Sequence, residues 1–126
     1  MRLVFGEKDA PYEEARVVVL PVPYDLSLSF LPGARRGPEA ILLASRELEP
    51  FLLELGAAPE EVGIHAAEPV PWVAGMAEES HRLIREEALK HLRAGKWLVA
   101  LGKGDSVSLA RSEARRVGQE GHSHRR

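Results

Sequence analysis

Two short apolar runs constrain the fold of this 126-residue chain more than any other feature. Val17–Leu20 is apolar throughout and mostly β-branched, and Trp97–Leu101 is apolar throughout until Gly102 ends it. Continuous apolar runs of this length are typical of strands buried on both faces, as in parallel sheets. Parallel strands need a crossover connection, usually a helix, and the residues between the two runs are numerous enough to supply one. The sequence therefore predicts an α/β fold.

A proline-rich stretch follows the first run. Pro21, Pro23 and Pro32 have no backbone donor for a ladder or a helix, so a long loop is expected to begin at Pro21. This loop lies at the C-terminal end of the expected strand. The polar residues after Gly102 lie at the corresponding end of the second run. Open α/β sheets bind their ligands at the C-terminal ends of their strands, so a site is expected at these two loops.

A helix is expected to follow the proline-rich loop. Pro38 suits the first position of a helix, and Glu39 suits the positive end of its dipole. The helix should run to about Glu49. Pro50 is expected to start a second short helical segment toward Leu55.

The next stretch is expected to add a strand and a longer helix. Glu61–Ala66 is the expected strand, although Gly63 weakens it. Met76–Ala94 carries apolar residues at helical spacing, and Gly95 should end that helix. Two i,i+4 ion pairs are expected on its exposed side: Glu78 with Arg82, and Glu86 with Lys90. Strands alternating with helices in this way predict a three-layer α/β/α arrangement around a parallel sheet.

The composition excludes some kinds of chemistry. The chain has no cysteine, so it has no disulfide framework, thiolate metal site or cysteine nucleophile. Asparagine and threonine are also missing, while charged residues make up 29% of the chain. This bias fits a thermophilic source, and GC-rich coding would produce a similar one.

The charge distribution divides the chain near its second apolar run. Residues 1–102 carry 11 basic and 16 acidic groups, whereas residues 103–126 carry 6 basic and 3 acidic groups. Apolar content also falls beyond Leu109, where Val117 is the only large apolar residue. We therefore expect a domain over residues 1–108 and a basic tail over residues 109–126, in which a frayed helix precedes a mobile end. No leader or membrane-spanning run is evident, so a cytoplasmic protein is expected.

Three stretches together resemble the ureohydrolase family of arginases, agmatinases and formiminoglutamases. Pro21–Ser45 reads PVPYDLSLSFLPGARRGPEAILLAS, which is similar to the family's N-terminal strand, its loop with an R-P-G-A-R-x-G-P-like run, and the helix that follows. His91–Gly102 reads HLRAGKWLVALG and resembles the end of a helix and the strand after it. Leu101–Ser108 reads LGKGDSVS and resembles the family's L-G-G-D-H-S-V-S-type loop.

The resemblance covers roughly residues 1–108 and implies a truncated arginase-like fold. Family members are more than twice as long. For the family it implies hydrolysis of a guanidino or amidino C–N bond by water bridged between two manganese ions. Such chemistry needs a metal-generated hydroxide, because the substrate is a poor electrophile and bulk water a poor nucleophile. The family takes one histidine ligand from the L-G-G-D-H-S loop and its other ligands from D-A-H-x-D and D-x-D segments.

The loop departs from the family pattern where the metal ligand should be. Without gaps, Lys103, Gly104 and Asp105 take the positions of the second glycine, the aspartate and the histidine. With one insertion and one deletion, Asp105 matches the aspartate and the histidine is missing. Neither later ligand segment is present in this sequence. We expect no catalytic residue, cofactor or metal ligand in this chain; Asp105 is the one candidate in a vestigial loop formed by Gly102, Lys103, Gly104, Asp105 and Ser106.

The positions of the histidines favour structural roles over a metal site. His65 lies in a possible strand without a second ligand at usable spacing. His81 and His91 lie ten residues apart on one helix, not at the spacing that brings two imidazoles to one metal, so both are expected on the helix surface. The Gly-His-Ser-His run at 121–124 is expected to be a solvated tail, with weak chelation as the alternative.

The remaining charged groups allow weaker alternatives for what this chain binds: a phosphate, a nucleic acid or another subunit. The Gly102–Ser106 stretch suits a phosphate through its lysine and glycine amides, but it lacks P-loop spacing. An arginine cluster could contact nucleic acid, yet no aromatic residue accompanies it; its members are Arg111, Arg115, Arg116, Arg125 and Arg126. Arg35 and Arg36 either support the loop or line a site or subunit contact.

These observations lead to two functional expectations. The first is a ureohydrolase-family protein that lacks the metal site and is inactive alone. The second is a non-catalytic assembly module that forms a homo-oligomer through an exposed sheet edge or docks on a full-length relative, because an unpaired apolar edge is a template for association. An enzyme whose metal site is completed by another chain is a third possibility. No membrane partner is expected, and nucleic acid is not the favoured partner.

Overall fold

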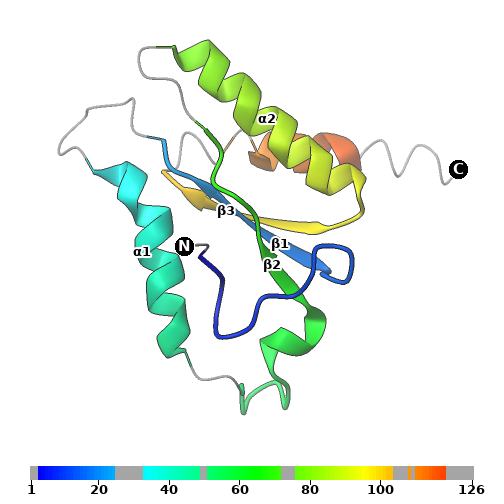
Figure 1. The fold of residues 1–126 in the computed structure, drawn as a ribbon. Coiled ribbons are helices and arrows are strands. Elements are labelled where there is room, and N and C mark those ends of the chain that lie inside the picture. The colour runs from blue at the N-terminus through cyan, green and yellow to red at the C-terminus, as the bar shows by residue number, and fades with distance from the viewer. Residues whose placement is uncertain are drawn as a thin grey trace, which may run out of the picture.

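The computed structural model describes residues 3–24, 33–48, 51–71, 76–103, 108 and 110–118. Within these residues, three parallel strands form a sheet in the order β2-β1-β3 (Figure 1). Their bounds are Val17–Val22 for β1, Ile64–Ala66 for β2 and Trp97–Gly102 for β3. The predicted parallel α/β sheet is therefore confirmed, and the first apolar run forms its central strand.

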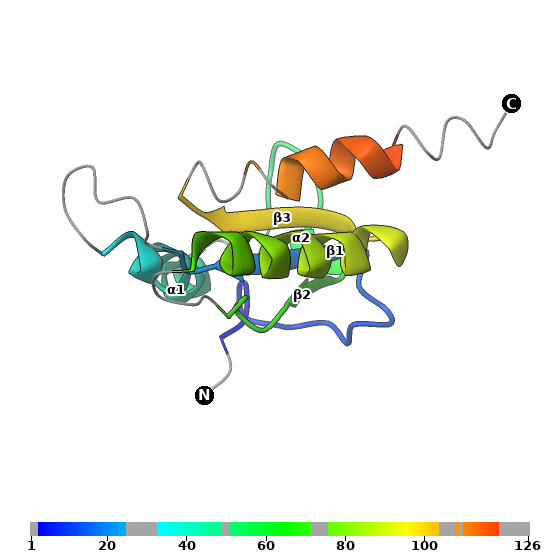
Figure 2. The same ribbon diagram turned by 90° about the horizontal axis from the view of Figure 1, so that it is seen from above.

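Helices lie on both faces of the sheet, as predicted (Figures 1 and 2). Helix α1, Gly37–Ala44, packs on one face, where Leu42 meets Val19 and Ala66. Helix α2, Ala77–Arg93, packs on the other face, where Ile84 and Ala88 meet the central strand. The two faces of β1 are thus both buried, which accounts for a strand that is apolar without alternation.

Strand β1 continues through Pro21, where a loop was expected to begin. Odd-numbered residues of β1 face β2: Val17 N–H donates to Gly63 O, and Ala67 N–H donates to Val19 O. Pro21, which has no N–H to donate, therefore faces the β2 side at a point beyond the end of β2. Its carbonyl still accepts a hydrogen bond from Val70 N–H at 3.0 Å. Proline is tolerated here because no ladder hydrogen bond is lost.

The region between α1 and β2 is less regular than predicted. After α1, Ser45–Glu47 forms a 3-10 turn, which shortens the expected helix. The helical segment expected from Pro50 toward Leu55 is wrong, because the described residues 51–56 form turns closed by a Leu52–Ala57 bridge. The expected strand Glu61–Ala66 is confirmed only for its second half, since Pro59–Val62 is a 3-10 turn.

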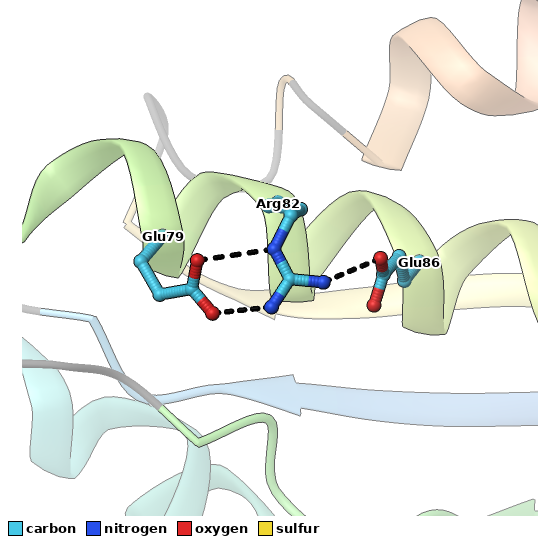
Figure 3. A network of polar contacts seen from close by, with 3 residues as sticks. All are labelled: Glu79, Arg82 and Glu86. Carbon is cyan, nitrogen blue, oxygen red and sulfur yellow. Dashed lines mark hydrogen bonds and ion pairs between the residues drawn. The ribbon is translucent and has the colours of Figure 1, made fainter.

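The long predicted helix and its ending at Gly95 are confirmed. Gly95 has a φ of 80°, a left-handed conformation that glycine adopts without strain. The predicted ion pairs have different partners. Figure 3 shows that Arg82 bonds to both Glu79 and Glu86: Nε lies 3.0 Å from Glu79 Oε2, and Nη1 lies 2.6 Å from Glu86 Oε1. Glu86 thereby pairs with Arg82, and Lys90 lies 3.9 Å from Glu87 instead.

The chain beyond β3 returns to the face covered by α2. Residues 110–118 are helical, and Ala110 is buried in the same core cluster as Ile84 and Ala88. Figure 2 shows this helix beyond β3, on the side away from β1. Residues 119–126, expected to be mobile, lie outside the described residues. In the described parts of the chain, no helix is long and apolar enough to cross a membrane.

Candidate functional site

The candidate site lies at the C-terminal ends of β1 and β3, where Val22 and Gly102 are in register. Gly102 ends β3, and the half-buried Lys103 follows it. The other members of the vestigial loop, Gly104, Asp105 and Ser106, lie outside the described residues. The strand end that should present the loop is thus formed as the sequence predicted.

Tyr24 and His81 meet at this same end of the sheet. The Tyr24 hydroxyl lies 3.1 Å from His81 Nε2, and their ring centroids are 5.4 Å apart. Tyr24 is buried beside Val22, and burial raises the pKa of its hydroxyl. His81 is half-buried and held by this bond, so the expectation of a surface histidine holds only in part.

A pocket of about 320 Å³ opens beside the ends of β1 and β2. Its polar groups come from Arg35, Glu39 and Glu68, and prolines from both loops line its walls. Gly33, with a φ of 125°, shapes the turn that leads into α1. Arg35 and Arg36 are both exposed, and Arg35 lines this pocket. Sequence reasoning had not singled out Glu68; its place just before Pro69, in the proline-rich stretch after an expected strand, was the available signal.

A second polar cluster lies at the opposite end of the sheet, and sequence reasoning missed it. The Tyr12 hydroxyl lies 2.9 Å from His91 Nδ1, and the Tyr12 ring also meets the His65 ring edge-on at 5.5 Å. His65 Nδ1–H donates to Ala10 O at 2.9 Å and lies 3.4 Å from Asp9 Oδ2. Two histidines that looked isolated are therefore joined through one tyrosine of the N-terminal segment.

His91 is not a surface residue, which corrects the expectation for it. Its side chain is 3% exposed because the N-terminal segment packs over the end of α2. Its Nε2 has no hydrogen-bond partner and lies 3.7 Å from Glu87 Oε2. Burial lowers the pKa of His91, with smaller and opposing effects from Glu87 and the nearby cations. The imidazole is therefore held in its neutral form.

This cluster lines a pocket of about 390 Å³, together with Glu68 and Lys90. Lys96 fixes the N-terminal segment beside it: Nζ donates to Tyr12 O at 2.8 Å and to Ala15 O at 2.7 Å, and lies 4.9 Å from the centroid of the Tyr12 ring. The side chains here fasten the N-terminal segment to β2 and α2. They form a structural junction.

The residues that the structure describes do not fit a two-manganese centre. Such a centre needs several histidine and carboxylate ligands converging on two cations. Within the described ranges, no three histidine, aspartate or glutamate side chains converge closely enough to hold a metal ion. At the C-terminal edge of the sheet, His81 is bonded to Tyr24 and the half-buried Lys103 brings a positive charge.

The arginine cluster is only partly placed. Arg111, Arg115 and Arg116 are exposed on the helix at residues 110–118, and Arg116 Nη2 lies 2.6 Å from Glu113 Oε2. Arg125 and Arg126 lie outside the described residues, as does the Gly-His-Ser-His run at 121–124.

Comparison with known proteins identifies the family. The model of the arginase family matches residues 15–120, most of the chain, so the chain belongs to the arginase family. The resemblance carried by the three sequence stretches is thereby confirmed, as is an arginase-like fold shorter than that of its relatives.

The curated relatives are much longer than this chain. An N(1)-aminopropylagmatine ureohydrolase of Thermus thermophilus is 91% identical over 116 residues, which are 92% of this chain and 40% of that protein. An agmatinase of Bacillus anthracis is 36% identical over 83% of this chain and 36% of its own length. The chain thus spans about two fifths of the relatives it matches. The similarity to Thermus proteins agrees with the thermophile-like composition.

Solved structures show the same fold. The crystal structure of Trypanosoma cruzi formiminoglutamase with two manganese ions superposes with a TM-score of 0.71 at 23% identity, over 85% of this chain and 37% of that one. A hypothetical agmatinase of Burkholderia thailandensis superposes with a TM-score of 0.63 at 26% identity, over 71% of this chain and 29% of that one.

Proposed function

We propose that this chain is an arginase-family segment that does not hydrolyse guanidino substrates alone. The observation that carries the proposal is the strand-end loop, where Lys103 and Asp105 replace the glycine and histidine that the family resemblance implies. The structure supports the proposal because the described residues provide no cluster of histidine, aspartate or glutamate side chains able to hold a metal ion. The chain retains the strands β1–β3 and lacks the ligands that metal-dependent hydrolysis needs.

Charge and ligand number both argue against two bound manganese ions. One carboxylate at Asp105 cannot bridge and complete the coordination of two hard cations, which requires several oxygen and nitrogen ligands. Lys103, next to the end of β3, adds a positive charge that repels a cation. Without the metals, water at neutral pH is too weak a nucleophile for this substrate class.

A urea-release assay tests this proposal. The 126-residue chain is incubated with manganese and N(1)-aminopropylagmatine, agmatine or arginine, and the Thermus thermophilus relative that is 91% identical serves as the matched positive control. We expect urea from the control and only background from this chain. Manganese-dependent urea release by the purified chain, above the background of a manganese-free sample, would refute the proposal.

A second function is favoured by the edge of the sheet. Within the described part of the chain, β3 pairs only with β1, and Trp97 is 77% exposed. The unpaired N–H and C=O groups of an edge strand are a template for pairing with another chain. We therefore propose a non-catalytic assembly role, in which this edge joins another polypeptide: a second copy or a full-length relative.

A further inference from the structure

The segment that precedes β1 runs along the outer edge of β2 (Figure 1), and we infer that its residues 7–12 lift from that edge in mild acid while the sheet stays folded. Residues 3–16 are called the N-terminal strap below. The inference is independent of both functions proposed above. Its grounds are the cover that the strap gives to β2, the different chemistry of its two anchors and the surroundings of His91.

The strap takes the place of a neighbouring strand along β2. Ile64 and Ala66 are the two residues of β2 that direct backbone groups to the strap. Ala10 N–H donates to Ile64 O at 3.0 Å, and Ala66 N–H donates to Asp9 Oδ1 at 2.9 Å. A segment that covers an edge strand in this way keeps it from pairing with another chain. Lifting residues 7–12 would uncover both groups.

The anchor on the α1 side of the sheet does not depend on pH. Leu3 and Phe5 pack against the cluster that contains Leu42. Gly6 N–H donates to the hydroxyl of the buried Ser45 at 2.9 Å. None of these groups titrates, so this end of the strap should stay in place in mild acid.

The anchor on the α2 side is an imidazole. The Tyr12 hydroxyl lies 2.9 Å from His91 Nδ1, and this bond holds the middle of the strap against the end of α2. Lys96 Nζ donates to Tyr12 O and Ala15 O, so the backbone stays attached where the strap joins β1. Opening is therefore limited to the residues between the two fixed ends.

A continuous series of contacts links His91 to the edge of β2. The Tyr12 ring meets the His65 ring edge-on at 5.5 Å. His65 Nδ1–H donates to Ala10 O at 2.9 Å, and Ala10 is the residue that bonds to Ile64 O. Because each contact positions the next, loss of the Tyr12 contact with His91 should loosen the strap along β2.

The closed strap keeps His91 away from water. Its side chain is 3% exposed, and among the described residues its Nε2 has no hydrogen-bond partner. Burial lowers its pKa, because a charged imidazole would be poorly solvated there. Lifting the strap lets water reach the ring and restores a pKa near the ordinary 6.5. Protons therefore bind the open form more readily, and the closed form loses stability as the pH falls below 6.5.

The charged groups around His91 do not cancel this effect. Glu87 favours the proton, but its Oε2 lies 3.7 Å from Nε2, too far for a hydrogen bond, and 3.9 Å from Lys90 Nζ. Burial is the larger influence on the pKa of His91. The titratable groups that face His91 or its contacts come from every neighbouring element: Glu87 and Lys90 on α2, Lys96 after α2, His65 on β2, Glu68 after β2, and Asp9, Tyr12 and Glu13 on the strap.

Amide hydrogen exchange, followed by nuclear magnetic resonance on the whole chain, tests the inference. Ala10 N–H reports on the strap, and the amide of the buried Val70, which donates to Pro21 O, reports on the sheet. Protection factors corrected for the intrinsic exchange rate are compared at pH 7 and pH 5. We expect protection of Ala10 to fall about tenfold, within the roughly 30-fold that one proton allows between pH 6.5 and 5. Protection of Val70 should change by less than about twofold, because the sheet stays folded.

Three variants assign the effect to His91. His91→Gln cannot titrate and should show the same Ala10 protection at both pH values. His81→Gln is the matched control: it removes a histidine of the same helix that bonds to Tyr24 instead, and should keep the tenfold fall. Tyr12→Phe removes the bond to His91, so its Ala10 amide should already be poorly protected at pH 7. This third variant tests the anchor even where glutamine at position 91 disturbs the fold.

Each contrary result would overturn the inference. Equal losses of protection at Ala10 and Val70 would show that acid unfolds the whole chain. Ala10 protection that does not change with pH would show that the strap stays closed. The same fall in His91→Gln, or full Ala10 protection in Tyr12→Phe, would show that the Tyr12–His91 contact does not hold the strap. The urea assay is independent of all these results.

Discussion

The hydrogen bond between Tyr12 and His91 shows how one residue ties the N-terminal segment to the rest of the chain. Tyr12→Phe would leave both ring nitrogens of a side chain that is 3% exposed without a partner. We expect the free energy of unfolding to fall by about 1–3 kcal/mol, the cost of an unsatisfied buried group. Urea denaturation measures it. Tyr24→Phe is the matched control, and should cost less because water can reach the half-buried His81. Equal losses would contradict this account.

The neutral form of His91 also makes stability depend on pH. Burial lowers its pKa in the folded protein, so between that value and the ordinary value of 6.5 the unfolded chain binds the proton more readily. The contribution is fully present above the unfolded pKa and is lost as the pH falls below it. We expect urea midpoints to decrease as the pH is lowered from neutral toward about 5.

A variant that cannot titrate provides the control for that pH dependence. His91→Gln should show a weaker decrease over the same pH interval, whatever its absolute stability. Glu87 favours the protonated form of His91, and three other neighbours oppose it: Lys90, His65 and Lys96. The two proteins compared must therefore both keep all four neighbours. Parallel curves for the two proteins would show that His91 is not the titrating group.

At the scale of elements, two glycines begin two strands under different constraints. Gly63 precedes β2 with a φ of 82°, and a Cβ there would lie 3.1 Å from Glu14 O and 3.2 Å from Ala15 Cα. Gly95 precedes β3 with a φ of 80°, and a Cβ there would meet no atom within 4 Å. The first glycine is required by conformation and by close packing, the second by conformation alone.

Substituting alanine for each glycine should reveal this difference. Gly95→Ala should cost about 1 kcal/mol of unfolding free energy, the strain of a left-handed residue with a side chain. Gly63→Ala should cost more, because the N-terminal segment must also move while Arg16 and Val17 keep their bonds to the Gly63 carbonyl. Denaturation of both variants checks the order. A smaller loss at Gly63 would contradict the packing argument.

At the scale of the whole molecule, association through β3 should couple stability to concentration. Two copies that bind only when folded stabilise each other by mass action, so the melting temperature should rise with protein concentration. Trp97→Asp should remove that dependence. Calorimetry over a wide concentration range provides the measurement, and a melting temperature independent of concentration in the unmodified chain would contradict self-association.

The sequence by itself determined the parallel α/β architecture, because the local spacing of apolar residues indicates both a strand buried on two faces and an amphipathic helix. It also determined the family, through Pro21–Ser45 and the loop after β3. It did not determine the packing of Tyr12, His65 and His91, which are far apart in the chain and share no spacing. The extension of β1 through Pro21 was likewise settled by where β2 ends. Only the tertiary structure decided these points, because burial and hydrogen-bond satisfaction depend on which distant segments meet.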